Sequence, residues 1–206
     1  MIQIEKIETF GWESAIRGMR NPMNSWDKSD SCSVEEGYRV GYNDLDLMQR
    51  LVNAGTDHSK FMRMIMVSMD ITAPLYWWKE YDTYKVGTVA NSCSTMHKIH
   101  AKEFTMNDFS HEHLSGGALV ALQSVIVPQL NEDRQAFIET KDKQYWHNMI
   151  QLLPSSYNQK RTVLVNYAVL RNIYHARKNH KLDEWRTLCK EIEMLPYAVS
   201  LITKEV

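Results

Sequence analysis

The segment between Asn166 and Arg177 carries two side chains that could recognise an anionic or carbonyl-bearing ligand. If the segment is helical, their spacing places the Asn166 amide and the Arg177 guanidinium on one side, about three turns apart. A guanidinium presents a planar fork of donors that matches paired acceptor atoms on a ligand. Alternatively, Arg177 together with Lys178 and His180 complements the negative end of its own helix. Charged residues are common at helix ends, so the spacing by itself favours the second interpretation.

A second candidate site is the row of amide and hydroxyl side chains at residues 91–95 (NSCST). Such a row suits a phosphate group if the backbone also turns its N–H groups toward the ligand. A polar loop or a helix N-cap is the simpler interpretation of the same residues.

Aromatic and histidine residues offer two further kinds of site. The aromatic group Tyr76, Trp77, Trp78, Tyr81 and Tyr84 could stack on a flat cofactor, but such residues more often pack in a core or against another subunit. The histidines at position 58 and at positions 111 and 113 lack a second pair of ligands at a recognisable spacing. We therefore predict no metal site.

The elements that must position these residues are mostly helical. Apolar spacing predicts helices over residues 43–55, 75–84, 132–153, 155–180 and 182–195. The apolar run over residues 118–130 fits a helix or a buried strand, and we expect the helix. Residues 61–74 read as a strand that Pro74 ends, and residues 1–40 could supply a short strand, a helix and a loop. Residues 82–100 fit either a loop beside a ligand or a second short strand. This mixture predicts an α+β fold.

Local signals place several helix ends. Asn43 and Asp44 are expected to supply an N-cap and a negatively charged first turn for the helix over residues 43–55, and Gly55 can adopt the left-handed conformation that stops it. Asn131 is expected to cap the charged helix over residues 132–153, which Pro154 closes.

Length and composition limit the class of protein. The 206 residues suffice for a single domain over residues 1–206, and 44% hydrophobic and 24% charged residues exclude a disordered or fibrous chain. A net charge of −1 gives no global field to attract nucleic acid or an anionic membrane, so we expect neither partner. No secretion signal or membrane-spanning stretch is apparent, and the three cysteines are far apart. We therefore expect a cytoplasmic protein with reduced thiols.

Taken in order, these segments resemble the flavin-dependent thymidylate synthases. In that family an apolar helix precedes a His-Ser/Thr-Pro-Phe-Glu-His turn, a strand ending in Ala-Pro and a Gln-Trp-x-Arg-His-Arg motif. Here DHSKF (57–61), DITAP (70–74) and YWWKEY (76–81) occupy these places. The family's Asn-Glu-x-Ser-x-Arg corresponds to NSCSTM (91–96). Its later Leu-Pro and Asn-rich helix with Leu-Arg correspond to LLP (152–154) and the helix carrying Asn166, Asn172 and Arg177.

The resemblance spans Asp44 to Leu195 and implies two sets of binding residues. Those expected at the cofactor are Lys79, Glu80, Tyr81, Asn166 and Asn172. Those expected at the substrate are Tyr76, Lys79, Ser92, Ser94 and Arg177. In the family, the position of Ser94 binds phosphate, and the position of Arg177 polarises the uracil ring, so Arg177 is the expected catalytic residue.

The same resemblance implies a fold and a reaction. The fold would be α+β, with helices packed on a small, mostly antiparallel sheet. The reaction would methylate dUMP to dTMP with methylenetetrahydrofolate and NADPH as co-substrates and FAD as cofactor, without a cysteine nucleophile. The small-molecule partner would be dUMP or a related nucleotide, and the assembly a homotetramer.

This chain departs from the family at charged motif positions. Lys79, Glu80 and Tyr81 replace Arg-His-Arg, Ser92 replaces a glutamate, and Met96 replaces an arginine. A phosphate or pyrophosphate would lose two or three charge-assisted hydrogen bonds, each about 1.5–3 kcal/mol, so we expect weaker or altered binding. Two other interpretations follow: a homologue that binds a pyrimidine nucleotide or serves as an oligomeric scaffold without redox chemistry, or a helical interaction module.

Overall fold

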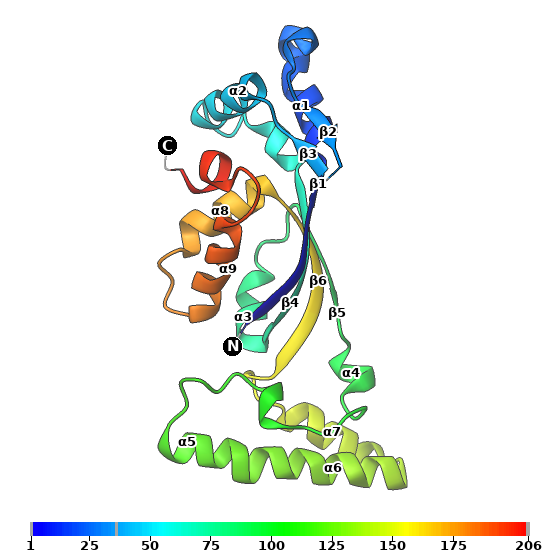
Figure 1. Ribbon diagram of the computed structural model, residues 1–206. Helices are drawn as coiled ribbons and strands as arrows, with labels where there is room; N and C mark the ends of the chain where they lie inside the picture. Colours follow the sequence, from blue (N-terminus) through cyan, green and yellow to red (C-terminus); the bar gives the residue numbers. More distant parts are fainter. Residues whose placement is uncertain (1, 36, 205–206) are drawn as a thin grey trace. The chain divides into compact units, whose positions relative to one another are not determined.

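The computed structural model describes residues 2–35 and 37–204 and has an α+β fold (Figure 1). The helices are α1 (Trp12–Arg20), α2 (Tyr42–Asn53), α3 (Leu75–Tyr81), α4 (Thr95–Lys98), α5 (Gly116–Ala121), α6 (Val127–Thr140), α7 (Lys143–Leu152), α8 (Tyr167–Arg177) and α9 (Asp183–Glu193). The strands are β1 (Gln3–Phe10), β2 (Cys32–Val34), β3 (Gly37–Arg39), β4 (Met66–Pro74), β5 (Thr88–Ser92) and β6 (Asn158–Asn166).

The strands form a four-stranded sheet in the order β1-β4-β6-β5 and an antiparallel pair, β2 with β3, in which Ser33 faces Tyr38. The α+β class with a small antiparallel sheet confirms the fold class expected from the sequence. The chain divides into two compact units. Unit 1 comprises residues 1–3, 71–83 and 91–162, and unit 2 comprises residues 4–70, 84–90 and 163–206. Each unit gathers segments from distant parts of the chain, and the single domain expected from the sequence stays a prediction.

Unit 1 has a core between α6, α7 and the segment that follows α4. Its buried side chains are Ile99, Phe104, Phe109, Leu122, Val127, Leu130 and Met149. Asn131, within α6, fixes this segment, because its side chain accepts a hydrogen bond from the Phe104 N–H at 2.8 Å and donates to the Phe104 carbonyl at 2.9 Å. The expectation that Asn131 is an N-cap is therefore wrong: the helix begins earlier, and the Asn131 amide replaces a backbone partner of Phe104.

The expected helix over residues 132–153 is two helices. α6 ends at Thr140, Lys141 adopts a left-handed conformation with φ 60°, and Asp142 caps α7 by accepting a hydrogen bond from the Gln144 N–H at 2.9 Å. The run from Gly116 to Thr140 is helical throughout, with a π-helical stretch at Leu122–Ile126, which confirms the helix expected over residues 118–130. Helical spacing on either side of a tight break is similar to that of one continuous helix, which explains the error.

The expected helix over residues 155–180 is wrong in its first half, where β6 runs from Asn158 to Asn166. Its burial alternates, with Gln159, Val163 and Val165 buried and Thr162 exposed. β-branched residues at alternate positions are typical of strands, but the helical spacing of the residues that follow concealed this signal. The side chain of Asn166, the last residue of β6, then caps α8 by accepting a hydrogen bond from the Val169 N–H at 3.0 Å.

The core of unit 2 packs helices around buried tryptophans. Trp12 of α1 contacts Tyr167 and Tyr197 edge-on, with ring centroids 5.3 Å apart in both pairs. Trp185 is fully buried in α9, which packs against α8. The helices expected over residues 43–55, 75–84 and 182–195 are confirmed as α2, α3 and α9, and the strand over residues 61–74 is confirmed from Met66 onward.

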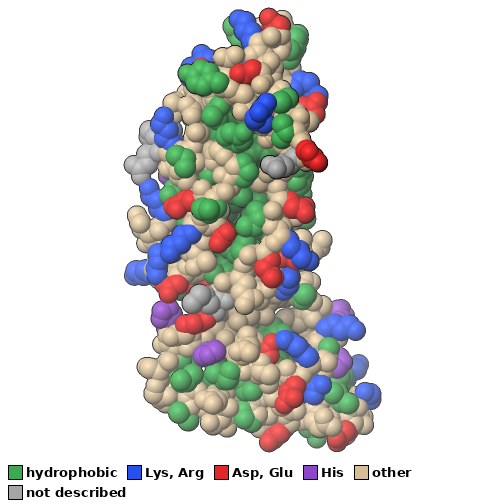
Figure 2. Space-filling view, in the orientation of Figure 1, with side chains coloured by type: hydrophobic (Ala, Val, Ile, Leu, Met, Phe, Trp, Pro, Cys, Tyr) green, Lys and Arg blue, Asp and Glu red, His purple; other side chains and the backbone are tan. Residues whose placement is uncertain are grey.

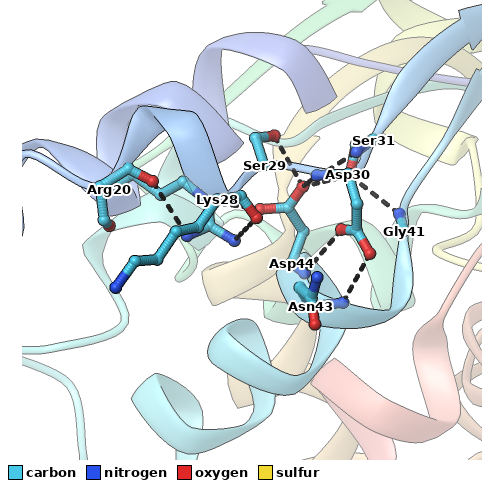
Figure 3. Close-up of polar contacts among 9 residues, drawn as sticks. Arg20, Lys28, Ser29, Asp30, Ser31, Gly41, Asn43 and Asp44 are labelled. Carbon is cyan, nitrogen blue, oxygen red and sulfur yellow. Dashed lines mark hydrogen bonds and ion pairs between the residues drawn. The ribbon is translucent and has the colours of Figure 1, made fainter.

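A buried ion pair ties α1 to α2 in unit 2 (Figure 3). The Arg20 Nε atom donates to the Asp44 carboxylate at 2.6 Å, and the side chains are 4% and 0% exposed. Asp44 Oδ2 also accepts from the Ser29 and Ser31 hydroxyls and from the Asp30 and Ser31 N–H groups. Burial alone would raise the pKa of Asp44, but these hydrogen bonds outweigh it and the pKa is lowered.

Asp44 lies in the first turn of α2, as expected, but neither Asn43 nor Asp44 is the cap. The cap residue of α2 is Gly41, and the Asp30 carboxylate, from the preceding loop, accepts from the N–H groups of Asn43 and Asp44 (Figure 3). Gly55 follows α2 with φ 103°, the left-handed conformation expected for it.

Charges of both signs are interspersed over the face drawn in Figure 2, in keeping with the net charge of −1. None of the helices in the described part of the chain combines the length and apolar character that a membrane span requires.

Candidate functional site

A cavity of about 570 Å³ in unit 1 contains Ser94, one of the expected substrate-binding residues. Two contacts hold its edge in place: the Cys93 N–H donates to the Lys160 carbonyl at 2.9 Å, and Gln159 Nε2 donates to the Cys93 carbonyl at 2.9 Å. Ser94 follows and caps α4 by accepting a hydrogen bond from the His97 N–H at 3.0 Å. Its hydroxyl hydrogen can still be donated to a ligand, because a serine hydroxyl both accepts and donates.

The cavity wall carries an excess of positive charge. Lys98, Lys102 and Lys160 line it, with Asp108 as the acidic residue among those described. Lys102 is ion-paired with Asp108, and this hydrogen bond raises the pKa of Lys102 despite the opposing effect of burial. Lys98 is exposed, and the Tyr157 hydroxyl, whose pKa burial raises, adds a further donor. Ammonium and hydroxyl donors around one space suit a phosphate or another small anion.

Arg161 is a basic residue of unit 1 that the sequence interpretation missed. Its guanidinium lies over the Trp78 ring, 4.2 Å from the centroid, and Nη1 donates to Asp82 at 2.7 Å. Nε donates to Gln159 Oε1 at 3.0 Å, and the side chain is 15% exposed. The signal that could have found it is the alternation around Val163 and Val165, which marks the segment as a strand beside the aromatic helix α3.

The expected site residues of α3 have different environments. Lys79 is exposed, and Tyr76 and Glu80 are half-buried. Tyr81 is buried, stacked on Trp77 with ring centroids 5.2 Å apart, and burial raises the pKa of its hydroxyl. Tyr81 is thus a core residue of unit 1, and only its neighbours present side chains at the surface. Ser92, at the end of β5, is exposed.

Arg177 lies in unit 2, where aromatic rings hold its guanidinium at the end of α8. Nε donates to the Tyr84 hydroxyl at 3.0 Å, and Nη1 lies 3.0 Å from His180 Nε2. The guanidinium carbon is 4.7 Å from the centroid of the buried Trp185 ring. This cation–π arrangement holds the charge in a half-buried position. The orientation of the guanidinium is therefore better defined than that of a solvated arginine at a helix end.

Asn166 does not lie on one helical face with Arg177, as the spacing suggested, because Asn166 is the extended residue before α8. Asn166 precedes α8, with Oδ1 on the Val169 N–H and Nδ2 3.5 Å from the Gly87 carbonyl, whereas Asn172 is an exposed residue within the helix. Gly87 has φ 78°, and a Cβ there would meet Asn166 Nδ2 at 2.6 Å. The polar atoms of Asn166 therefore serve the local structure of unit 2. Within the described residues, no group of three or more His, Cys, Asp or Glu side chains is placed to hold a metal ion.

The fold matches that of the flavin-dependent thymidylate synthases. A crystal structure of thymidylate synthase X (ThyX) from Helicobacter pylori with FAD and dUMP superposes with a TM-score of 0.71 at 18% identity, covering 100% of both chains. A second ThyX structure from the same organism, complexed with FAD and dUMP, gives 0.68 at 18% identity over 96% of this chain and 98% of that one. The UMP/dUMP methylase PolB from Streptomyces cacaoi, bound with 5-Br dUMP, gives 0.64 at 12% identity over 94% and 89% of the chains. No protein-family model and no curated protein sequence matches this chain.

The resemblance drawn from the sequence is therefore confirmed for the fold. At 18% and 12% identity, the roles of individual side chains remain predictions.

Proposed function

We propose that this chain is a divergent flavin-dependent thymidylate synthase-like protein that methylates dUMP, or a related pyrimidine nucleotide, at C5 of the ring. The observation that carries the proposal is the ThyX fold over the full length of both chains. The cationic cavity at Ser94 and the oriented guanidinium of Arg177 add two groups with the chemistry that a pyrimidine nucleotide requires.

Each group has a separate role in this proposal. Ser94 donates its hydroxyl hydrogen to a phosphate oxygen, and Lys98 adds an ammonium donor to the same anion. Arg177 donates to a carbonyl of the pyrimidine and withdraws electron density from the ring, which favours bond formation at C5. Tyr84 and Trp185 hold the guanidinium in one orientation, so little conformational freedom is lost when the ring binds.

Some of the residues expected to bind FAD have accessible polar side chains, and others do not. Lys79 and Asn172 are exposed and could hold polar groups of FAD, and Glu80 and Tyr76 are half-buried beside Lys79. Tyr81 is inside the core and Asn166 is occupied with α8 and Gly87, so neither presents a polar group for the isoalloxazine or the pyrophosphate. We propose Lys79, in unit 1, and Asn172, in unit 2, as separate candidates for contacts with FAD. Bound reduced flavin would supply the hydride, with NADPH and methylenetetrahydrofolate as the proposed co-substrates.

The cofactor proposal is tested by the visible absorption spectrum of the purified protein, before and after incubation with excess FAD and removal of the unbound fraction. A retained flavin band supports the proposal if Lys79→Ala or Asn172→Ala makes the band weaker. A protein that retains no FAD contradicts it.

The nucleotide proposal is tested by calorimetric titration with dUMP and with deoxyuridine, which lacks the phosphate. Lys98→Gln should weaken dUMP binding about tenfold, the size of one charge-assisted bond, and leave deoxyuridine binding unchanged. Arg177→Ala should weaken both ligands, since it is assigned to the ring. Arg50→Ala, an exposed arginine of α2, is the matched control. Equal effects of Lys98→Gln on the two ligands would refute the phosphate assignment.

A second candidate function is nucleotide binding without redox chemistry. The burial of Tyr81 favours it, because this residue replaces a motif arginine and lies in the core. Binding of dUMP with no retained FAD and no methylation activity would identify this case. In either case, we propose a homotetramer in the cytoplasm, to be tested by analytical ultracentrifugation and by localisation of a tagged chain.

A further inference from the structure

Unit 1 contains a second concave site, which none of the expected nucleotide or cofactor residues lines. It is a groove of about 500 Å³ between α4 and α7, whose walls include Met96, His97, His100, Phe137, Trp146 and His147. Below we call it the histidine groove.

The aromatic walls of the histidine groove are fixed. Trp146 Nε1 donates to the Met96 carbonyl at 2.9 Å, which ties α7 to α4 across the groove. The His100 ring meets Phe137 edge-on at 4.9 Å, and the His100 carbonyl accepts from Arg134 Nε at 3.0 Å. A rigid set of rings around a space of this size accepts a flat ring by stacking or edge contact.

The polar side chains that line the histidine groove are imidazoles and one ammonium group. Lys143, the first residue of α7, contributes a positive charge, and no aspartate or glutamate is among the described residues that line the groove. This charge complements a ligand that carries an anionic group beside its ring.

His100 adds an observation that is independent of the charge. Its Nδ1 atom is buried and has no hydrogen-bond partner among the described residues. Buried polar atoms are normally paired, so this nitrogen needs a partner that the described chain does not supply. The residue as a whole is half-buried and lines the groove, so a molecule bound there is one possible source of this partner.

We propose that the histidine groove binds a small planar aromatic anion, with the ring between Trp146 and Phe137 and the anionic group near Lys143 and His100. The site is separate from the cavity at Ser94, and the proposal does not depend on the proposed function.

The test uses 2-naphthoate, a planar ring with one carboxylate, and its neutral isostere 2-naphthamide. Binding is measured by calorimetry and by NMR shifts of the histidine Hε1 resonances, assigned with single His→Gln variants. We expect saturable binding of 2-naphthoate that shifts the resonances of His97, His100 and His147 and weaker binding of 2-naphthamide. An intact groove that binds neither probe, or shifts confined to other histidines, would overturn the proposal.

Two variants separate the charge from the ring. Lys143→Gln should weaken 2-naphthoate about fivefold, the worth of one charge pair near 4 Å in water, and leave 2-naphthamide unchanged. His100→Phe keeps an aromatic ring beside Phe137 but removes the unpartnered nitrogen, and should also weaken the carboxylate selectively. Lys190→Gln, an exposed lysine of α9, controls for net charge. Circular dichroism and the melting temperature confirm that each variant is folded; equal weakening by Lys190→Gln and Lys143→Gln would refute the assignment.

Discussion

Replacing Asp44 by asparagine removes the negative charge that faces Arg20 in the interior of unit 2. The Arg20 side chain is 4% exposed, so its charge would stay buried without a counter-ion. Loss of one partner of a buried pair typically costs 3–5 kcal/mol. In addition, the N–H groups of Asp30 and Ser31, which donate to Asp44 Oδ2 at 3.0 and 3.1 Å, would lose a carboxylate acceptor. We expect Asp44→Asn to lower the free energy of unfolding by about 4 kcal/mol.

Urea unfolding followed by circular dichroism measures this change, and thermal unfolding provides a second value. For a chain of this size, about 4 kcal/mol corresponds to a fall in melting temperature of roughly 8–16 °C. Asp46→Asn is the matched control, because Asp46 forms an exposed i,i+4 pair with Arg50 on the same helix and should change stability by at most about 0.5 kcal/mol. A loss below about 1 kcal/mol for Asp44→Asn would show that the pair does not hold α1 to α2 as described.

The same carboxylate predicts a pH dependence. The pKa of Asp44 is lowered in the folded state, so its stabilising contribution is present above the ordinary pKa of aspartate, 3.8, and is lost as the pH falls through the folded-state value. The wild type should therefore lose stability on acidification below about pH 4. The stability difference between wild type and Asp44→Asn should shrink over the same range; a difference that stays constant with pH would contradict the assignment to this group.

Two further experiments test other parts of the structure. Gly87→Ala should destabilise the chain by about 1–3 kcal/mol, because φ is 78° and the added Cβ would meet the Asn166 amide. Gly117→Ala is the control, because nothing lies within 4 Å of the added Cβ. Equal melting temperatures of the two variants would refute the argument. Iodoacetamide at pH 8 should label Cys32 and Cys93 in the folded protein but Cys189 only after unfolding, since Cys189 is buried and its pKa is raised to about 11. Mass spectrometry of the alkylated peptides reads this out, and rapid native labelling of Cys189 would contradict its burial.

Residues 155–166 show why part of the fold could not be predicted from the sequence. The sequence predicts one helix from residue 155 to residue 180, but only the part that forms α8 is helical. Residues 158–166 form β6 instead, because their backbone pairs with other strands of the sheet. The strands with which β6 pairs lie far away in the sequence, so no pattern within residues 155–166 identifies its partners. The same holds for Asn131, whose partner Phe104 lies 27 residues away.

The sequence by itself determined the helices α2, α3 and α9, the strand β4 and the α+β class, because apolar spacing, Pro74 and Gly55 act on their immediate neighbours. It also determined, through the order of its motifs, the family whose fold the chain shares. Only the tertiary structure decided what the candidate residues do. In the folded chain, Tyr81 is buried against Trp77, and the Asn166 side chain caps α8. The Arg177 guanidinium contacts Tyr84 and Trp185. Burial and partner choice depend on which distant segments pack together, and no local pattern specifies that.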